Sequence, residues 1–125
     1  MSITCTDLIA LSQRLIAGTD EVDLRSGVSR SYYAAYHHLC AWELKLPVPG
    51  SNSGPGGGAH QQLANRLNNP APECSSEQKK LSKTLSAMMS HAKTKRHAAD
   101  YDLNGTIDQL SATQSVAAAQ QILAK

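Results

Sequence analysis

The stretch TKRHAADYDL, residues 94–103, places side chains that can bind phosphate close together. Arg96 and Asp100 are four residues apart, so on a helix their side chains are neighbours and can form an ion pair. This pair would fix the orientation of the guanidinium group, and Tyr101 adds a hydroxyl group one position later. An oriented guanidinium can bind a phosphate through two parallel hydrogen bonds. The alternative is a structural cluster of arginine, aspartate and tyrosine that joins the last two helices.

The segment before this stretch is strongly basic. The chain has a net charge of only +2, but residues 79–96 contain no acidic side chain. Their basic residues are Lys79, Lys80, Lys83, Lys93, Lys95 and Arg96. A local block of positive charge attracts polyanions even when the net charge of the protein is small. A solvated helix face without a ligand explains the same pattern.

A second group of candidate residues lies in RSYYAAYH, residues 30–37. Arg30 and His37 are seven residues apart, which is a rotation about 20° short of two full helical turns. Their side chains therefore project from the same face of a helix, with Tyr33 between them. On the wall of a cleft they could hold a phosphodiester, because arginine stabilises negative charge and histidine transfers a proton. The competing interpretation is that both are ordinary polar residues beside a buried seam.

The sequence does not contain the motifs of metal sites or of phosphate-binding loops. No two histidines have the H-E-x-x-H spacing, and no carboxylates or thiolates complete a ligand set, so no metal is expected. The glycines at 56–58 have no Lys-Ser or Lys-Thr after them, so they form no phosphate-binding loop, and no cofactor is expected. Three widely spaced cysteines indicate reduced thiols in the cytoplasm. We see no secretory signal and no run near the ~20 apolar residues of a membrane span.

These residues must be positioned by helices. Phe is absent, strand formers rarely alternate, and Ala, Leu, Gln and Lys dominate the periodic stretches. We therefore predict an all-α fold: one domain, residues 1–125, forming an up-and-down bundle of four main helices plus one short helix. The main helices are expected over 4–17, from Thr19 or Asp20 to Pro47, after Ser75, and after Thr106; the short one is AHQQLANRLNN, residues 59–69.

Apolar periodicity predicts which faces of these helices are buried. The clearest seam, in the second helix, is Val28, Tyr32, Ala35, Leu39, Trp42 and Leu46. The seam of the long basic helix is Leu81, Leu85, Met88 and Ala92. The seam of the last helix is Ile107, Leu110, Val116 or Ala117, Ala119 and Leu123. Residues 47–58 hold three of the five prolines and five of the eight glycines, which predicts a flexible surface loop.

Three stretches together resemble the HEPN superfamily (higher eukaryotes and prokaryotes nucleotide-binding). They are RSGVSRSYYAAYHHL, AHQQLANRL and RHAADYDL, and their order and spacing match over about residues 20–105. The resemblance implies a prokaryotic, cytoplasmic helical bundle that forms a homodimer. It also implies a role in a toxin–antitoxin, defence or nucleotidyltransferase-linked system.

Catalytic members of this superfamily are metal-independent ribonucleases with an R-x(4–6)-H motif. Here Arg96 matches the arginine and His97 the polar residue after it, but Tyr101 stands where the shortest motif has its histidine. A tyrosine, with a reference pKa of about 10, does not readily supply a proton near neutral pH. The motif is therefore incomplete. Arg30 to His37 is the one literal R-x(4–6)-H in the chain, on a different helix.

The resulting hypothesis is a basic cleft that binds RNA or a nucleotide, formed by side chains of two helices. The predicted binding residues are Arg30, Tyr33, His37, Lys93, Arg96, Asp100 and Tyr101. In an enzyme, His37 would be the general acid or base, with Arg30 and Arg96 holding the phosphate. One alternative is a catalytically inactive docking partner of a nucleotidyltransferase, and that enzyme would then modify Tyr101. The other is a plain protein-interaction domain. An antitoxin is the further partner that the resemblance implies.

Overall fold

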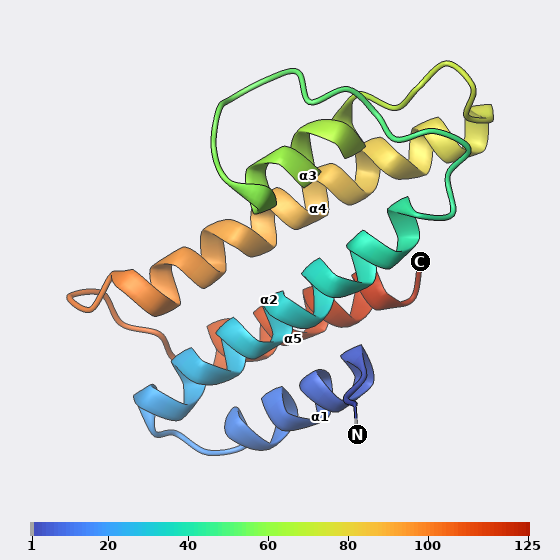
Figure 1. Ribbon diagram of the computed structural model, residues 1–125. Coiled ribbons are helices and arrows are strands. Elements are labelled where there is room, and N and C mark those ends of the chain that lie inside the picture. Colours follow the sequence, from blue (N-terminus) through green and yellow to red (C-terminus); the bar gives the residue numbers. More distant parts are fainter. Residues whose placement is uncertain (1) are drawn as a thin grey trace.

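Five helices and no strands make up residues 2–125, which the computed structural model describes. The helices are α1 (Cys5–Leu15), α2 (Glu21–Glu43), α3 (Ala59–Asn68), α4 (Ser76–Tyr101) and α5 (Gln109–Leu123). The all-α bundle predicted from the sequence is confirmed, and the four long helices alternate in direction (Figure 1). The short α3 lies along α4 and runs opposite to it (Figure 1). None of the helices in this range is long and apolar enough to span a membrane.

Side-chain caps fix where α1, α2, α4 and α5 begin, whereas α3 begins after Gly58 without one. Ser75 and Gln78 form the predicted capping box at the start of α4, and the Asp20 carboxylate accepts a hydrogen bond from the Val22 N–H at the start of α2. The predicted cap of the last helix is wrong. Asp108, not Thr106, caps α5, because its carboxylate accepts a hydrogen bond of 2.8 Å from the Ser111 N–H.

Helix α2 lies at the centre of the bundle and contributes to both hydrophobic clusters of the core. Four members of its predicted seam are buried: Val28, Tyr32, Ala35 and Leu39. The last two, Trp42 and Leu46, are only half-buried, because they lie at and beyond the end of α2, which is Glu43. The central position of α2 means that its polar side chains can reach α3, α4 and the loop before α5.

The buried face of α5 agrees with the prediction in part. Val116 and Ala119 are buried as predicted, together with Ala112 and Ile122, whereas Leu110 is 67% exposed and Leu123 is half-buried. Leu110 is two residues before the buried Ala112, about 160° away around the helix, so it lies on the solvent side. In α4, Leu85 and Ala92 are buried as predicted, but Met89 fills the core and Met88 is half-buried.

The loop at residues 47–58 runs back along the outer side of α3 (Figure 1). The buried Asn65 amide of α3 donates hydrogen bonds to Asn52 Oδ1 (3.0 Å) and to the Pro55 carbonyl (2.8 Å). A Cβ atom at Gly50 would lie 2.0 Å from the Arg66 carbonyl oxygen, so only glycine fits there. The loop is on the surface, as predicted. Its flexibility stays a prediction, but these contacts fix how α3 follows it.

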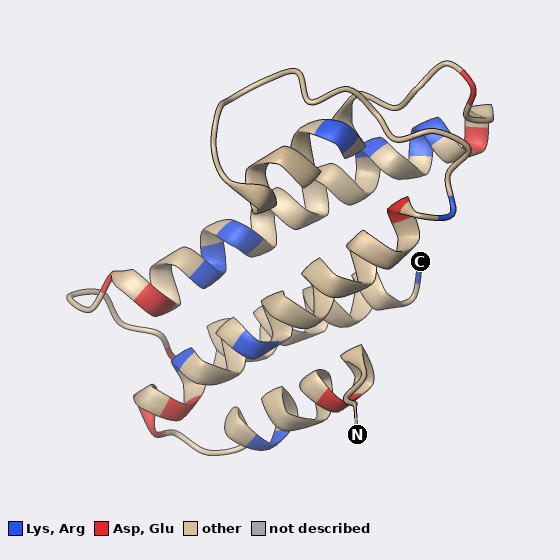
Figure 2. Cartoon of the chain, in the orientation of Figure 1, with Lys and Arg blue, Asp and Glu red and all other residues tan. Residues whose placement is uncertain are grey.

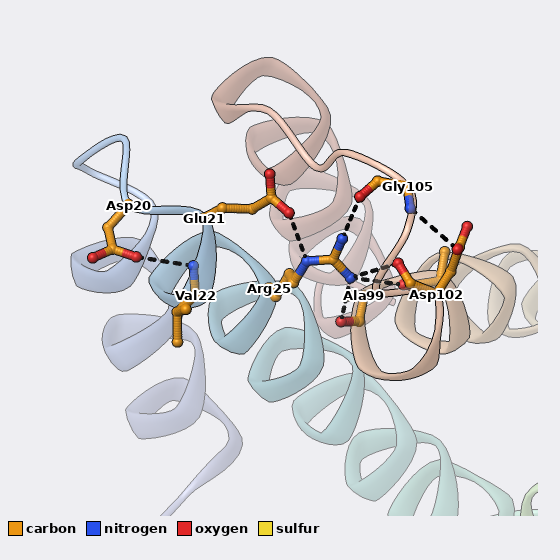
Figure 3. A network of polar contacts seen from close by, with 8 residues as sticks. Asp20, Glu21, Val22, Arg25, Ala99, Asp102 and Gly105 are labelled. Atoms are coloured by element: carbon orange, nitrogen blue, oxygen red, sulfur yellow. Dashed lines mark hydrogen bonds and ion pairs between the residues drawn. The ribbon is translucent and has the colours of Figure 1, made fainter.

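Charged residues are distributed unevenly over the bundle. Basic bands run along α4, and acidic residues gather where α2 begins and α4 ends (Figure 2). Arg25 lies at this acidic end and ties the two helices together (Figure 3). Its Nη1 donates hydrogen bonds to the carbonyls of Ala98 (3.2 Å), Ala99 (3.0 Å) and Asp102 (2.9 Å), and its Nη2 donates to Gly105 O (2.7 Å). Arg25 therefore caps the C-terminal end of α4 and sets the position of residues 96–101 against α2.

Candidate functional site

The Arg96 guanidinium of α4 lies among three phenol rings. Its central carbon is 5.0 Å from the ring centre of Tyr32 and 6.0 Å from those of Tyr33 and Tyr101. These distances are in the range of cation–π attraction. The Arg96 side chain is only 13% exposed, and its Nε is buried without a hydrogen-bond partner. Aromatic contacts position this arginine, while part of its hydrogen-bonding capacity is unused.

The predicted pairing of Arg96 with Asp100 is confirmed as an ion pair. Arg96 Nη1 is 3.6 Å from Asp100 Oδ2, too far for a good hydrogen bond. The same carboxylate oxygen accepts a hydrogen bond of 3.2 Å from the Ser29 hydroxyl of α2. In its structural role the pair therefore joins α4 to α2. The alternative in which it joins the last two helices is wrong.

Tyr33 of α2 connects the Arg96 guanidinium with that of Arg30, also on α2. The Arg30 guanidinium carbon lies 4.8 Å from the ring centre of Tyr33, and that of Arg96 lies 6.0 Å from the same ring. Arg30 is exposed and Tyr33 half-buried. The fold thus brings Arg30 and Tyr33 together with Arg96, Asp100 and Tyr101, as the two-helix hypothesis requires.

Two imidazoles lie beside this group: that of His97, whose ring centre is 4.8 Å from that of Tyr101, and that of His60, at the start of α3, which contacts Tyr32 and Tyr33. His60 Nδ1 is 2.7 Å from the Tyr32 hydroxyl oxygen, and the His60 ring stacks on Tyr36 with centres 3.9 Å apart. Burial lowers the pKa of His60 below its usual 6.5, and the positive charges of Arg96 and Lys93 lower it further. Burial also raises the pKa of Tyr32 to about 12. At neutral pH His60 is therefore uncharged and Tyr32 keeps its proton.

The predicted wall residue His37 lies farther out. Its exposed ring contacts Tyr36 edge-on at 5.4 Å between centres, so Tyr36 has His37 on one side and His60 stacked on its face. Lys93, the remaining predicted binding residue, donates a hydrogen bond of 3.0 Å to Gln61 Oε1 next to His60. The histidine beside the Tyr32–Arg96 contact is thus His60 of α3, and not His37 of α2.

We call the assembled residues the Arg96 cluster. They are Arg30, Tyr32, Tyr33, His60, Lys93, Arg96, Asp100 and Tyr101. Three of them are cationic at neutral pH and one is anionic, while His60 is neutral. In Figure 2, the basic bands in the C-terminal half of α4 belong to this region, whereas those near the start of α4 do not. Such a surplus of positive charge, next to aromatic rings, favours an anion that carries a planar group.

Sequence reasoning missed His60 as a site residue. The histidine stands 28 positions after Tyr32 and 36 before Arg96, and no spacing rule links residues on separate helices. The one signal was its presence in AHQQLANRL, one of the three stretches behind the HEPN resemblance.

In the part of the chain that the structure describes, no three His, Cys, Asp or Glu side chains gather closely enough to hold a metal ion. The three cysteines are free: Cys74 is buried, and Cys5 and Cys40 are half-buried. Comparison with known proteins gave no match to a protein-family model, to a curated protein or to a solved structure.

Proposed function

We propose that this protein is a HEPN-like module that binds RNA or a nucleotide through the Arg96 cluster. The observation that carries the proposal is the state of Arg96: it is largely buried, held by aromatic rings, and has a single ion pair at 3.6 Å. Burying a guanidinium with so few hydrogen bonds is costly unless a ligand completes them. A phosphate has the charge and the acceptor geometry to do so.

The rings around Arg96 support a nucleic-acid ligand over a simple anion. Tyr101 is 64% exposed, and Tyr33 is half-buried between two guanidinium groups. Exposed aromatic faces beside cationic side chains are the usual surfaces on which unpaired bases stack. We therefore favour a single-stranded RNA segment or a nucleotide as the ligand, with its phosphate at Arg96.

Substitution of Arg30 and Arg96 tests the proposal. We expect Arg96→Gln to weaken binding of a short, fluorescently labelled 2′-O-methyl RNA by about tenfold and to lower its salt slope by about one. The 2′-O-methyl groups block cleavage through the 2′-hydroxyl. Because Arg30 is exposed, Arg30→Gln should weaken binding without affecting the fold. The measurement is fluorescence anisotropy at several salt concentrations.

The matched control is Lys80→Gln, an exposed lysine near the other end of α4. We expect it to change the affinity by less than twofold or so, because exposed charges far from the contact are screened. Binding that does not depend on salt, or that falls equally in Lys80→Gln and Arg96→Gln, would contradict the proposal and favour a plain protein-interaction domain.

A metal-independent ribonuclease is the enzymatic form of the same proposal. It is favoured by the 2.7 Å contact of His60 with Tyr32, which orients a neutral imidazole close to Arg96. In this form Arg96 and Arg30 bind the phosphate, and His60 transfers the proton that the sequence hypothesis gave to His37.

A second candidate is a catalytically inactive partner of a nucleotidyltransferase. The exposure of Tyr101, 64%, favours it, since the phenol oxygen could attack the α-phosphate of a nucleoside triphosphate, releasing pyrophosphate and its own proton. We then expect protein purified from its native cells to carry a nucleotide mass increment that maps to Tyr101 by peptide mass spectrometry. An unmodified Tyr101 in those cells would contradict this candidate.

The homodimer implied by the HEPN resemblance belongs to the proposal as well. Val22 and Leu103, 71% and 75% exposed, line a groove between α1, α2 and the end of α4 that also includes Arg30 and Asp100. A second copy placed there would cover these apolar side chains beside the Arg96 cluster. This arrangement would also fit a site shared between two copies, or the docking of an antitoxin.

A further inference from the structure

A second cavity lies on the other side of α4, between α4, α5 and α2. It has a volume of about 260 Å³, below the ~300–1,000 Å³ of sites for drug-sized ligands. Small side chains leave this space open, because Ala92 of α4 faces Ala118 and Ala119 of α5. We call it the α4–α5 groove. Its size fits a ligand smaller than a nucleotide.

The groove is separate from the Arg96 cluster. His91 and Lys95 line it from α4, whereas Lys93 and Arg96 face α3 and the tyrosines. Lys93 and Lys95 are two residues apart, which turns their side chains about 160° from each other around the helix. The buried Tyr32 is common to both, as a wall of the groove and a neighbour of Arg96.

Within residues 2–125, the polar side chains that α4 and α5 contribute to the groove form no hydrogen bond or ion pair, whereas the two from α2 are engaged: the Ser31 hydroxyl donates to the Val28 carbonyl and the Tyr32 hydroxyl bonds to His60 Nδ1. In the described range, residues 2–125, Lys95 forms no ion pair, and no acidic residue lines the groove. The hydroxyl groups of Ser111 and Ser115 form no hydrogen bond in that range, unlike the buried Ser82, which donates to the Leu67 carbonyl at 2.6 Å. Serines that face a neighbouring helix usually satisfy their hydroxyl groups on a carbonyl. Here Ser111 and Ser115, together with the exposed Lys95 and His91, line one small space.

We propose that the α4–α5 groove binds a small organic monophosphate. Lys95 supplies charge and hydrogen bonds for the phosphate, and His91, Ser111, Ser115 and Gln114 add further donors. A carboxylate has too few acceptor sites for this many donors, whereas a phosphate has enough. The apolar floor, which includes Val28, accepts the organic group.

Nuclear magnetic resonance titration of the labelled protein tests this site, with phenyl phosphate and inorganic phosphate as probes. We expect both to shift the backbone amides of residues 91–95 and 111–119, and phenyl phosphate to bind more tightly because its ring reaches the apolar floor. Lys95→Gln should weaken phenyl phosphate binding about tenfold. Lys80→Gln, an exposed lysine of the same helix, should leave it unchanged.

Two further variants make the test decisive. Ala118→Leu fills the groove and should weaken phenyl phosphate more than inorganic phosphate, while Arg96→Gln should leave the shifts in the groove intact. Shifts that appear only around Arg96 and disappear in Arg96→Gln would overturn the proposal. So would equal losses in Lys95→Gln and Lys80→Gln, or the absence of saturable shifts in the groove. Since RNA binding depends on Arg96, failure of one site leaves the other unaffected.

Discussion

Replacing Arg25 with alanine is expected to destabilise the protein by about 3 kcal/mol and to lower its Tm by roughly 10 °C. The guanidinium group is 11% exposed and donates to four backbone carbonyls and to Glu21 Oε2. Three of those carbonyls belong to residues 98, 99 and 102, where α4 ends and its last carbonyls form the negative pole of the helix dipole. Alanine would leave them without this donor. The measurement is urea unfolding followed by circular dichroism.

Two control variants separate this role from the simple loss of a charge. Arg14→Ala removes an exposed arginine from the last turn of α1 and should change the stability by less than about 0.5 kcal/mol. Arg25→Lys keeps the charge but cannot donate to several carbonyls at once, so we expect an intermediate loss. If Arg25→Ala and Arg14→Ala were equally stable, the contacts of Arg25 would not hold α4 against α2.

The contacts of Arg25 also show why sequence patterns predict some features and miss others. The Ser75–Gln78 capping box and the Arg96–Asp100 pair join residues three and four positions apart, so helical geometry alone predicts them. The four carbonyls that Arg25 contacts are 73 to 80 residues away, and nothing in the local sequence marks them. Local contacts can be predicted; contacts between helices depend on how the helices pack.

The same distinction applies to the core and the site. The seam of α2 was predicted well because one long helix keeps one register from Val28 to Leu39. In α5 the predicted Val116 and Ala119 are buried, but an early choice of cap, Thr106 in place of Asp108, wrongly placed the exposed Leu110 in the seam. His60 was missed because its site role comes from Tyr32 and Tyr36, on a different helix.

The position of His60 leads to an expected result for catalysis. If the protein is a ribonuclease, we expect His60→Ala to lower the rate of RNA cleavage in EDTA by about 100-fold or more, the usual loss when a proton-transfer group is removed. The reaction is transfer of the phosphate to the neighbouring 2′-oxygen: the base accepts the 2′-hydroxyl proton, the new P–O bond forms, and the 5′-oxygen leaves with a proton. Gel electrophoresis of a labelled RNA measures the rate.

Two tautomers of His60 fit its hydrogen bond with Tyr32. Burial raises the pKa of Tyr32 to about 12, so its phenol stays protonated, and either the phenol O–H or the His60 Nδ1–H can donate in this contact. A role for His60 as the base requires the Nδ1–H tautomer, in which Nε2 carries the free lone pair; no hydrogen bond joins Nε2 to another residue in the range 2–125. In that tautomer Nε2 would accept the 2′-hydroxyl proton, with the phosphate held at Arg96.

The pH dependence of the rate follows from the lowered pKa of His60. A base acts when it is neutral, so the rate should rise with pH from the acidic side, with the midpoint of the rise below pH 6.5, because the pKa of His60 is lowered from that value.

The matched controls are His37→Ala, which removes an exposed imidazole from the edge of Tyr36, and His91→Ala, on the other side of α4. Both should retain most of the activity, and circular dichroism should show that all three variants are folded. A loss confined to His37→Ala would assign the proton transfer to His37, whereas cleavage unchanged in His60→Ala and Arg96→Ala would come from a contaminant. The pH profile of His37→Ala distinguishes the two histidines further. The charge of His37 lowers the pKa of His60, so without His37 a rate that depends on His60 should rise at slightly higher pH. A rate that depends on His37 would be lost instead.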